Sequence, residues 1–281
     1  MDLRPTIYRK GIDLTLKILS SLSACIGIIF LIWILWEVLK RGATSLNWDF
    51  FTKLPAPPGM EGGGLSNAIL GTAIITLIAT LMGVPIGVLS GVYLAEFGKS
   101  NILGKSVRFT LNVMMGVPSI IVGLFVYTIL VISMGHFSGF AGAVSLAIIM
   151  IPVVSRTTED MLNMVPNSLR ESALAVGAPH WKVTLGVVFR AAKSGMITGI
   201  LLAIARVSGE TAPLLFTALN SPYWPGSINQ PTANLTVTIF NYAMSPFADW
   251  QEMAWGASFL IMIAVLATTI LARFVAKEAN K

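Results

Sequence analysis

The chain has 281 residues, of which 55% are apolar and only 11% are charged, and its mean hydropathy is +0.78. Soluble domains carry about 25% charged residues. The composition therefore excludes a soluble enzyme and indicates one membrane domain without a soluble appendage. The net charge of +6 does not indicate nucleic-acid binding, because the basic residues lie in short segments between apolar runs. The single cysteine, Cys25, excludes an intrachain disulfide and a multi-cysteine metal site.

Apolar runs predict six transmembrane helices, since one span needs about 20 mostly apolar residues. The first run follows basic residues as a signal sequence would. It is long for a signal sequence and no clear cleavage site follows, so we interpret it as an uncleaved span. The predicted spans cover residues 18–36, 67–94, two within 109–155 that separate near 134–139, 194–216 and 253–272.

The distribution of Lys and Arg predicts the topology. With a cytoplasmic N-terminus, fifteen of these residues lie inside and three outside, which favours two cytoplasmic termini and an even number of spans. The inside set is Arg4, Arg9, Lys10, Lys17, Lys99, Lys105, Arg108, Arg156, Arg170, Lys182, Arg190, Lys193, Arg273, Lys277 and Lys281. The outside set is Lys40, Arg41 and Lys53, and Arg206 lies within the membrane.

Small residues recur at every fourth position of the second predicted span, at Ala79, Gly83, Gly87, Gly91 and Ala95. On a helix they form one ridge that another backbone approaches closely. Helix packing is the favoured interpretation of this ridge, and a pore lining is the alternative.

The third predicted span contains Pro118. A proline within a membrane helix is tolerated where neighbouring helices or a cavity satisfy the freed carbonyls. We therefore expect a kink there.

Motifs for catalysis are missing from the sequence. Two Gly-Lys-Ser triplets, at 98–100 and 104–106, lack the glycine that a P-loop needs five residues earlier. The two histidines lie far apart without metal-ligand spacing, and no nucleophile–base pattern is visible. We therefore predict no catalytic residue and no metal. If transport is active, its energy comes from another chain or from an ion gradient.

The segment between the fourth and fifth spans predicts a short helical hairpin under the membrane. Residues 168–171, Ser-Leu-Arg-Glu, read as a capping box that starts a helix. Gly177 ends this helix, and residues 178–181 begin a second, amphipathic one. So short a helix is marginal alone and needs a partner surface.

This segment resembles the E-A-A-x-x-x-G loop of ABC importer permeases, through Glu171, Ala173 and Gly177. Ser172 replaces the first alanine, and Arg190 replaces the proline of the motif's continuation. The resemblance implies a coupling helix that docks into a groove of an ATPase subunit.

Arg206 and Glu210 lie in the fifth predicted span, four residues apart, and are expected on one helix face. A charge in mid-membrane costs about 2.5–3.5 kcal/mol on insertion scales, and such residues usually face a bundle interior or a water-filled path. Pro213 leaves the carbonyl of Gly209 without its helical partner. The Arg fork suits phosphate-like oxyanions. The alternative is a structural ion pair, within the chain or across a dimer interface.

Residues 205–219 resemble the fifth-span signature of the permease subunits of bacterial phosphate ABC importers. The resemblance implies an all-α integral membrane protein with the six-helix type I importer permease fold and a cytoplasmic coupling helix. It implies a permease core over residues 67–275, preceded by an N-terminal segment, first helix and periplasmic loop over 1–66 and followed by a cytoplasmic tail over 276–281.

The same resemblance implies the location and the partners. The chain would lie in the bacterial inner membrane and form half of a phosphate pore with a second homologous permease. Two ATPase subunits would use ATP, a periplasmic phosphate-binding protein would deliver the cargo, and this chain would bind no cofactor and no nucleic acid.

Three alternatives remain at this point. A permease for another oxyanion, such as molybdate, sulfate or phosphonate, would share most features. An ion-driven secondary transporter or channel subunit would also place charges in the membrane, but it would show inverted repeats, which we do not find. A membrane scaffold gives no reason to bury Arg206 and Glu210.

Overall fold

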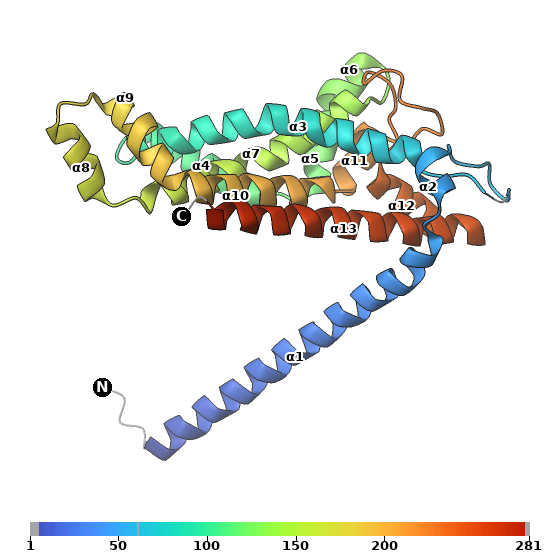
Figure 1. Cartoon of the computed structure of the whole chain (residues 1–281), viewed down its shortest axis with the longest axis horizontal. Coiled ribbons are helices and arrows are strands. Elements are labelled where there is room, and N and C mark those ends of the chain that lie inside the picture. Colours follow the sequence, from blue (N-terminus) through green and yellow to red (C-terminus); the bar gives the residue numbers. More distant parts are fainter. Residues whose placement is uncertain (1–5, 61, 279–281) are drawn as a thin grey trace.

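The computed structural model describes residues 6–60 and 62–278, and this part of the chain is almost entirely helical (Figure 1). Its one β-feature among the described residues is an isolated bridge between Pro55 and Gly63. The α-helices are α1 (Thr6–Ser45), α2 (Trp48–Thr52), α3 (Ser66–Val92), α4 (Ile102–Gly116), α5 (Ser119–Val126), α6 (Ile132–Met134), α7 (Gly139–Asn163), α8 (Asn167–Ala175), α9 (His180–Val183), α10 (Phe189–Ser208), α11 (Ala212–Thr217), α12 (Leu235–Ala243) and α13 (Ala248–Glu278). Three π-helical segments continue them, η1 (Tyr93–Phe97), η2 (Tyr127–Val131) and η3 (Thr184–Val188).

Five helical stretches in the described part of the chain are long and apolar enough to cross a membrane. The number reaches six if the pair 102–116 and 119–134, which is bent by 104°, is counted as one span. The all-α fold is therefore confirmed, and the prediction of six spans agrees with this upper count, in which the bent pair is the third span. The five unbent stretches are α1, α3 with η1, α7, α9 through α10, and α13.

The bend in the third span follows from Pro118. Proline disfavours helical backbone in the residue before it, and Val117 is extended at ψ 128°. The Val117 N–H closes α4 by donating to the carbonyl of Met114 at 3.3 Å, and Pro118 then precedes the first residue of α5. The expected kink is therefore a complete break between two helices. The next predicted break, near 134–139, is confirmed, since Gly135 ends α6 at φ +75° and the Ser138 side chain caps α7.

Several predicted helix limits were too short. The first helix begins at Thr6 and ends at Ser45, and the last runs from Ala248 to Glu278. The apolar runs marked only the part of each helix that suits the hydrocarbon core, about 20 residues long. The predicted tail over 276–281 is helical as far as Glu278. Arg4 and Lys281, used for the topology, lie outside the described residues.

The glycine ridge of α3 packs against α7. A Cβ atom at Gly87 would lie 2.7 Å from Cβ of Val154, and one at Gly91 would lie 2.5 Å from the carbonyl oxygen of Ser155. Only glycine permits so close a backbone approach. The two helices form the centre of the bundle, and α10 completes the main apolar core around buried Met150.

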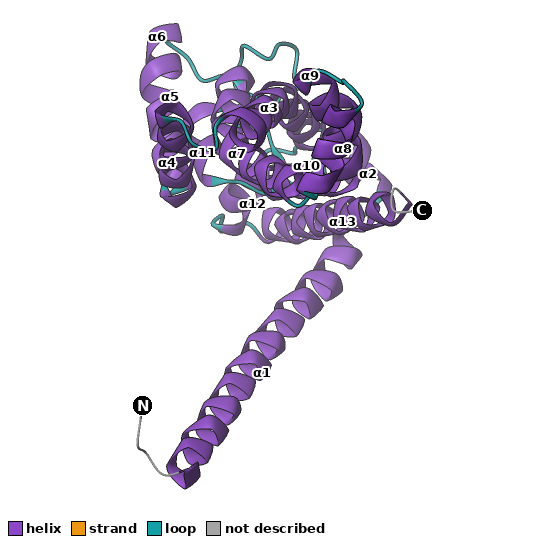
Figure 2. Ribbon diagram, turned by 90° about the vertical axis from the view of Figure 1, so that its left-hand side faces the viewer, coloured by secondary structure: helices purple, strands orange, loops and turns teal. Residues whose placement is uncertain are grey.

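Helix α1 stands apart from this bundle (Figures 1 and 2). It meets α13 near its end, where Gly42 contacts Phe259 and the guanidinium of Arg41 lies 5.2 Å from the Trp255 ring centre. Its apolar side chains between Leu14 and Trp36 are exposed. This surface needs lipid or a neighbouring subunit to cover it.

Candidate functional site

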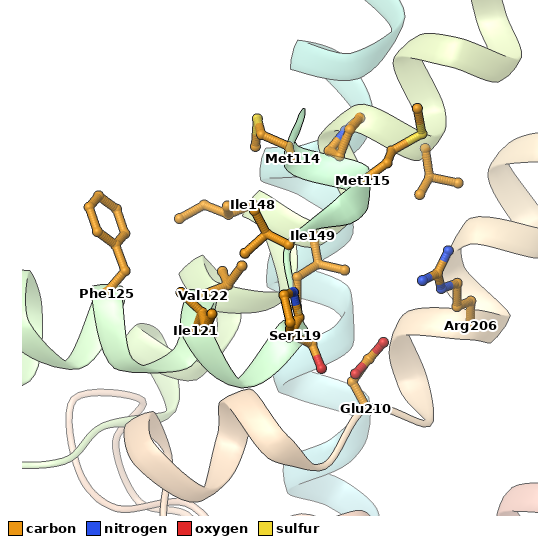
Figure 3. A pocket seen from close by; sticks show the side chains of 14 residues that line it. Met114, Met115, Ser119, Ile121, Val122, Phe125, Ile148, Ile149, Arg206 and Glu210 are labelled. Carbon is orange, nitrogen blue, oxygen red and sulfur yellow. The ribbon is translucent and has the colours of Figure 1, made fainter. Parts of the chain in front are cut away.

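A cavity of about 530 Å³ lies between the bend of the third span and the end of α10. Figure 3 shows Arg206 and Glu210 on one wall of it and apolar side chains such as Phe125 and Val122 on the other. Its lining residues are Met114, Met115, Val117, Pro118, Ser119, Ile121, Val122, Phe125, Ile148, Ile149, Pro152, Val153, Arg206 and Glu210.

Two helix breaks face each other across this cavity. The first is the break between α4 and α5 at Val117 and Pro118. The second separates α10, which ends at Ser208, from α11, which begins at Ala212. Irregular backbone at membrane depth occurs only where protein buries it or where it lines a water-filled cavity. The cavity therefore lies where a solute path through the bundle is expected.

The prediction that Arg206 and Glu210 share a helix face is wrong, because the fifth span is not one helix. Gly209 adopts φ −94° and ψ 0° after the last turn of α10. Pro213 has no N–H to continue a helix, but it fits the first turn of a new one, and it lies there in α11. Glu210 consequently lies in the connection between two helices.

No ion pair or hydrogen bond joins the side chains of Arg206 and Glu210 among the described residues. Arg206 is exposed and Glu210 is half-buried. Both side chains line the cavity (Figure 3). The guanidinium also lies in the last turn of α10, where the partial negative charge of the helix end stabilises a cation. Both charged groups are therefore available to a solute.

The cavity offers an anion one strong contact and few others. Arg206 is the only cationic residue in its lining, and Ser119 supplies the only hydroxyl. The remaining lining residues, apart from Glu210, are apolar. Charges attract each other more strongly in apolar surroundings than in water, while the small number of donors limits how tightly an anion is held. Such a balance suits passage better than storage.

Neighbouring elements hold the connection after α10 in place. The Thr236 hydroxyl of α12 donates to the main-chain carbonyl of Glu210 at 2.9 Å. Gly123 of α5 lies so near α11 that a Cβ there would be 2.6 Å from Cα of Pro213. Neither residue was singled out from the sequence. The only signal for Gly123 was a glycine inside an apolar run, and Thr236 carried none.

The segment that resembles the coupling loop forms α8 at one end of the molecule (Figure 1). The predicted capping box is wrong, since α8 begins at Asn167 after extended Pro166 and no side chain caps it. Ser168 therefore lies inside the helix. Gly177 follows α8 with φ +84°, the left-handed conformation that favours glycine. Glu171 is exposed, and Ala173 packs against the cluster of buried residues around Val183.

The second helix of the predicted hairpin differs from expectation. It does not lie separately under the membrane, because α9, η3 and α10 form one continuous stretch from His180 to Ser208. Around α8 and α9 several large apolar side chains remain exposed, including Val176 at 84% and Trp181 at 59%. This end of the molecule therefore offers a partly apolar surface for a partner.

Metal ligation has no support in the described part of the chain, which holds no group of three His, Cys, Asp or Glu side chains that could bind an ion.

None of the small residues of the α3 ridge lines the cavity. Four charged residues at the α8 end of the bundle pair with one another but were missed as a group, because the partners lie 51 and 74 residues apart in the sequence. They are Glu159, which is buried, and Glu96, Arg108 and Arg170, which are partly buried.

The family described as "Binding-protein-dependent transport system inner membrane component" matches residues 83–281. A Yersinia pestis protein named "Phosphate transport system permease protein PstA" is 48% identical over 268 residues, which cover 95% of this chain and 91% of that protein. A Methanocaldococcus jannaschii protein named "Probable phosphate transport system permease protein PstA" is 39% identical and covers 87% of this chain and 83% of its own length.

Solved structures share the fold at low sequence identity. A chain of the MetNI methionine ABC transporter in an inward-facing conformation superposes with a TM-score of 0.64 at 19% identity, covering 77% of this chain and 96% of its own. A chain of a bacterial alginate ABC transporter in complex with a periplasmic protein gives a TM-score of 0.68 at 15% identity and covers 99% of both chains.

Proposed function

This chain belongs to the binding-protein-dependent transport system inner membrane components and, within them, groups with the PstA permeases, and we propose that the cargo it conducts is inorganic phosphate. As a member of this family it is a multi-pass membrane subunit of an ABC transporter and not an enzyme. ATP hydrolysis belongs to a separate subunit, and this chain binds no cofactor in our proposal.

The observation that carries the proposal is Arg206 in the cavity between two helix breaks. Its side chain is exposed, has no carboxylate partner among the described residues and is the sole cation of the lining. A guanidinium offers a flat fork of donors that matches two oxygens of a phosphate. The names of the relatives provide independent support for this cargo.

Glu210 favours the protonated form of the cargo. An ionised carboxylate only accepts hydrogen bonds, so it accepts one from a phosphate oxygen that carries a proton. It repels an unprotonated dianion such as sulfate. Because no ion pair engages Glu210 among the described residues, its oxygens are available for this contact. The pair thus attracts phosphate through Arg206 and selects it through Glu210.

A second permease subunit completes the pore in this proposal. The wall that carries Arg206 is exposed on the surface of this chain, and an unpaired charge facing lipid would be costly. A homologous subunit that covers this wall would enclose the cavity and keep lipid away. The relatives' membership of phosphate transport systems supports a PstC-like partner in this position.

Two ATPase subunits dock at the α8 end in this proposal, one on each permease. Glu171, Ala173 and Gly177 lie in or directly after α8, which has no fully buried residue. The exposed apolar side chains beside it supply the partner-facing surface. A periplasmic phosphate-binding protein would deliver cargo at the opposite end, near α2 and α12.

The proposed topology places both termini in the cytoplasm of a bacterial cell, with the chain in the inner membrane. The start of α1, the end of α13 and α8 all lie toward the same end of the molecule (Figure 1). The permease core over residues 67–275 would then cross the membrane five times after the first helix. A Lys and Arg excess at the α8 end agrees with this orientation.

The test is ATP-driven phosphate uptake in proteoliposomes that contain this chain with its co-purified partners. The variant Glu171→Lys reverses an exposed charge on α8, and Asp13→Lys also reverses an exposed charge, on α1. We expect ATP-dependent uptake in the wild type and in Asp13→Lys, and its loss in Glu171→Lys. Uptake that needs no ATP and ignores both substitutions would identify a gradient-driven carrier. Sulfate competing equally with phosphate would contradict the cargo assignment.

A further inference from the structure

Arg108 of α4 ties two other helices together at the α8 end of the bundle. Its Nη2 and Nη1 atoms donate to the main-chain carbonyls of Leu94 and Gly98, at 2.7 and 3.0 Å. Its Nε atom donates to the carboxylate of Glu159 at 2.7 Å. One guanidinium thus caps the end of α3 and η1 and pairs with a carboxylate on α7.

Arg170 of α8 makes the reciprocal arrangement. Its Nη atoms donate to the carbonyls of Val165 and Leu162 at 2.6 and 2.7 Å, which caps the end of α7. Nη2 also donates to the carboxylate of Glu96 in η1 at 3.0 Å. Each arginine therefore neutralises the carbonyl end of one central helix, where a cation is favoured, and pairs with a carboxylate on the other.

These contacts are sheltered from water. The exposed fraction of the side chain is 12% for both Arg170 and Glu96, 25% for Arg108 and 5% for Glu159. Among the described residues, the other ion pairs join side chains only three or four positions apart. The Arg108–Glu159 and Arg170–Glu96 pairs are thus the two that connect different elements. Removing one partner of such a sheltered pair is far more disruptive than removing an exposed one.

We propose that these four residues form a rigid link that transmits movement of α8 to α4 and so to the cavity. The chain of contacts runs from Arg170 to the ends of α3 and α7, and from Glu159 through Arg108 into α4. Met114 and Met115, at the other end of α4, line the cavity. The distance along α4 from residue 108 to residue 115 is about 10 Å at 1.5 Å per residue.

The link explains how a small helix moves a large bundle. Helix α8 has no fully buried residue and touches the core through partly buried Ala173 and Leu174. Those apolar contacts alone would let α8 tilt without carrying its neighbours. Bonds to two helix ends oblige α3, α7 and α4 to follow as packed elements, which shift as rigid bodies and do not bend continuously. Glu96, Arg108, Glu159 and Arg170 act as positioning residues.

The inference rests on the proposed function, and its first test measures how much phosphate enters per ATP hydrolysed. The assay uses the complete transporter in proteoliposomes, with Glu96→Gln and Glu159→Gln as variants. Asp160→Asn is the matched control, because Asp160 is the next residue of α7, pairs within that helix and is 46% exposed. We expect ATP hydrolysis to persist while the phosphate imported per ATP falls about tenfold in both variants. A change of that size is usual for substitutions that lie between two coupled sites. The control should keep the wild-type ratio.

If Glu96→Gln and Glu159→Gln import as much phosphate per ATP as the wild type, the proposed link is wrong. A wild-type complex that hydrolyses ATP without moving phosphate would instead count against the proposed cargo. A second measurement tests the link without phosphate. Spin labels at Ser106 of α4 and Ser168 of α8, with Cys25 replaced by serine, report the distance between these helices before and after ATP binding.

The link predicts that this distance stays constant in the wild-type background while both labels move relative to the second permease. In Glu159→Gln the distance should change on ATP binding. A change of similar size in the wild-type background would show that α8 moves independently of α4 and would overturn the proposal. This wild-type measurement decides the question even if a variant fails to assemble.

Discussion

Arginines are used in opposite ways at the α8 end of the bundle and in the cavity. Arg108 and Arg170 are each engaged by two main-chain carbonyls and one carboxylate. Arg206 is exposed and has no such partner in the described part of the chain. A guanidinium that carbonyls and a carboxylate engage therefore holds elements together, whereas one without such partners in a cavity is available to a solute.

The main chain also differs between the two regions, because helix ends are capped by side chains in one and face a cavity in the other. At the α8 end, side chains from other elements cap the free carbonyls of α3 with η1 and of α7. At the cavity the helices stop at Pro118 and Gly209, and the breaks face an apolar space. One region is therefore built to move as a unit and the other to receive a cargo.

The largest effect is expected from Arg206→Gln, which should abolish phosphate uptake while the complex still assembles. A forked contact to phosphate comprises two charge-assisted hydrogen bonds of about 1.5–3 kcal/mol each, so uptake should fall more than about 100-fold. Uptake assays and size-exclusion chromatography of the complex check the two halves of this prediction. Lys17→Gln, at an exposed residue of α1, is the control. A variant that no longer assembles would make Arg206 a structural residue.

Arg170→Gln should lower the stability of the complex, in contrast to Arg206→Gln. It leaves Glu96 without its partner and two helix-end carbonyls without their donor, at a cost of about 3–5 kcal/mol for a buried pair. The melting temperature of the purified complex should therefore fall markedly, whereas Arg206→Gln should leave it nearly unchanged. Arg156→Gln, at a residue whose side chain is 47% exposed, is the control. Equal melting temperatures for Arg170→Gln and the wild type would show that the contacts of Arg170 do not hold the α8 end of the bundle together.

Gly87→Ala should destabilise the bundle by about 1–3 kcal/mol, the usual cost of an overpacked core. The added Cβ would lie 2.7 Å from Cβ of Val154. Gly27→Ala, in exposed α1, meets nothing within 4 Å and should be neutral or slightly stabilising. Thermal unfolding in detergent distinguishes the two. A neutral Gly87→Ala would show that α3 and α7 are less tightly packed than described.

The smallest effect is expected from Arg206→Lys. The ammonium keeps the charge but loses the flat fork, so about one charge-assisted hydrogen bond is lost and uptake should fall about tenfold. The kinetic assay is phosphate uptake at several phosphate concentrations. Full activity of this variant would show that charge alone, without the forked geometry, serves the cargo.

Long-range features account for most of what sequence reasoning missed. The all-α fold and the spans follow from apolar runs, which are local, and Arg206 stood out as a charge within one of them. The break after Ser208 was underestimated, because Gly209 and Pro213 were interpreted as a weakened turn and not as the end of one helix and the start of another. The Arg170–Glu96 pair spans 74 residues and has no periodic signature.

The most direct test of the central claim is a cryo-electron microscopy structure of the complete transporter, trapped with ATP and supplied with phosphate or arsenate. We expect oxyanion density in the cavity within about 2.7–3.2 Å of the Arg206 nitrogens, a normal hydrogen-bond distance, with Glu210 beside it. Arg206 bound to a carboxylate of either permease, with no oxyanion density in the cavity, would show that this arginine is structural and does not bind the cargo.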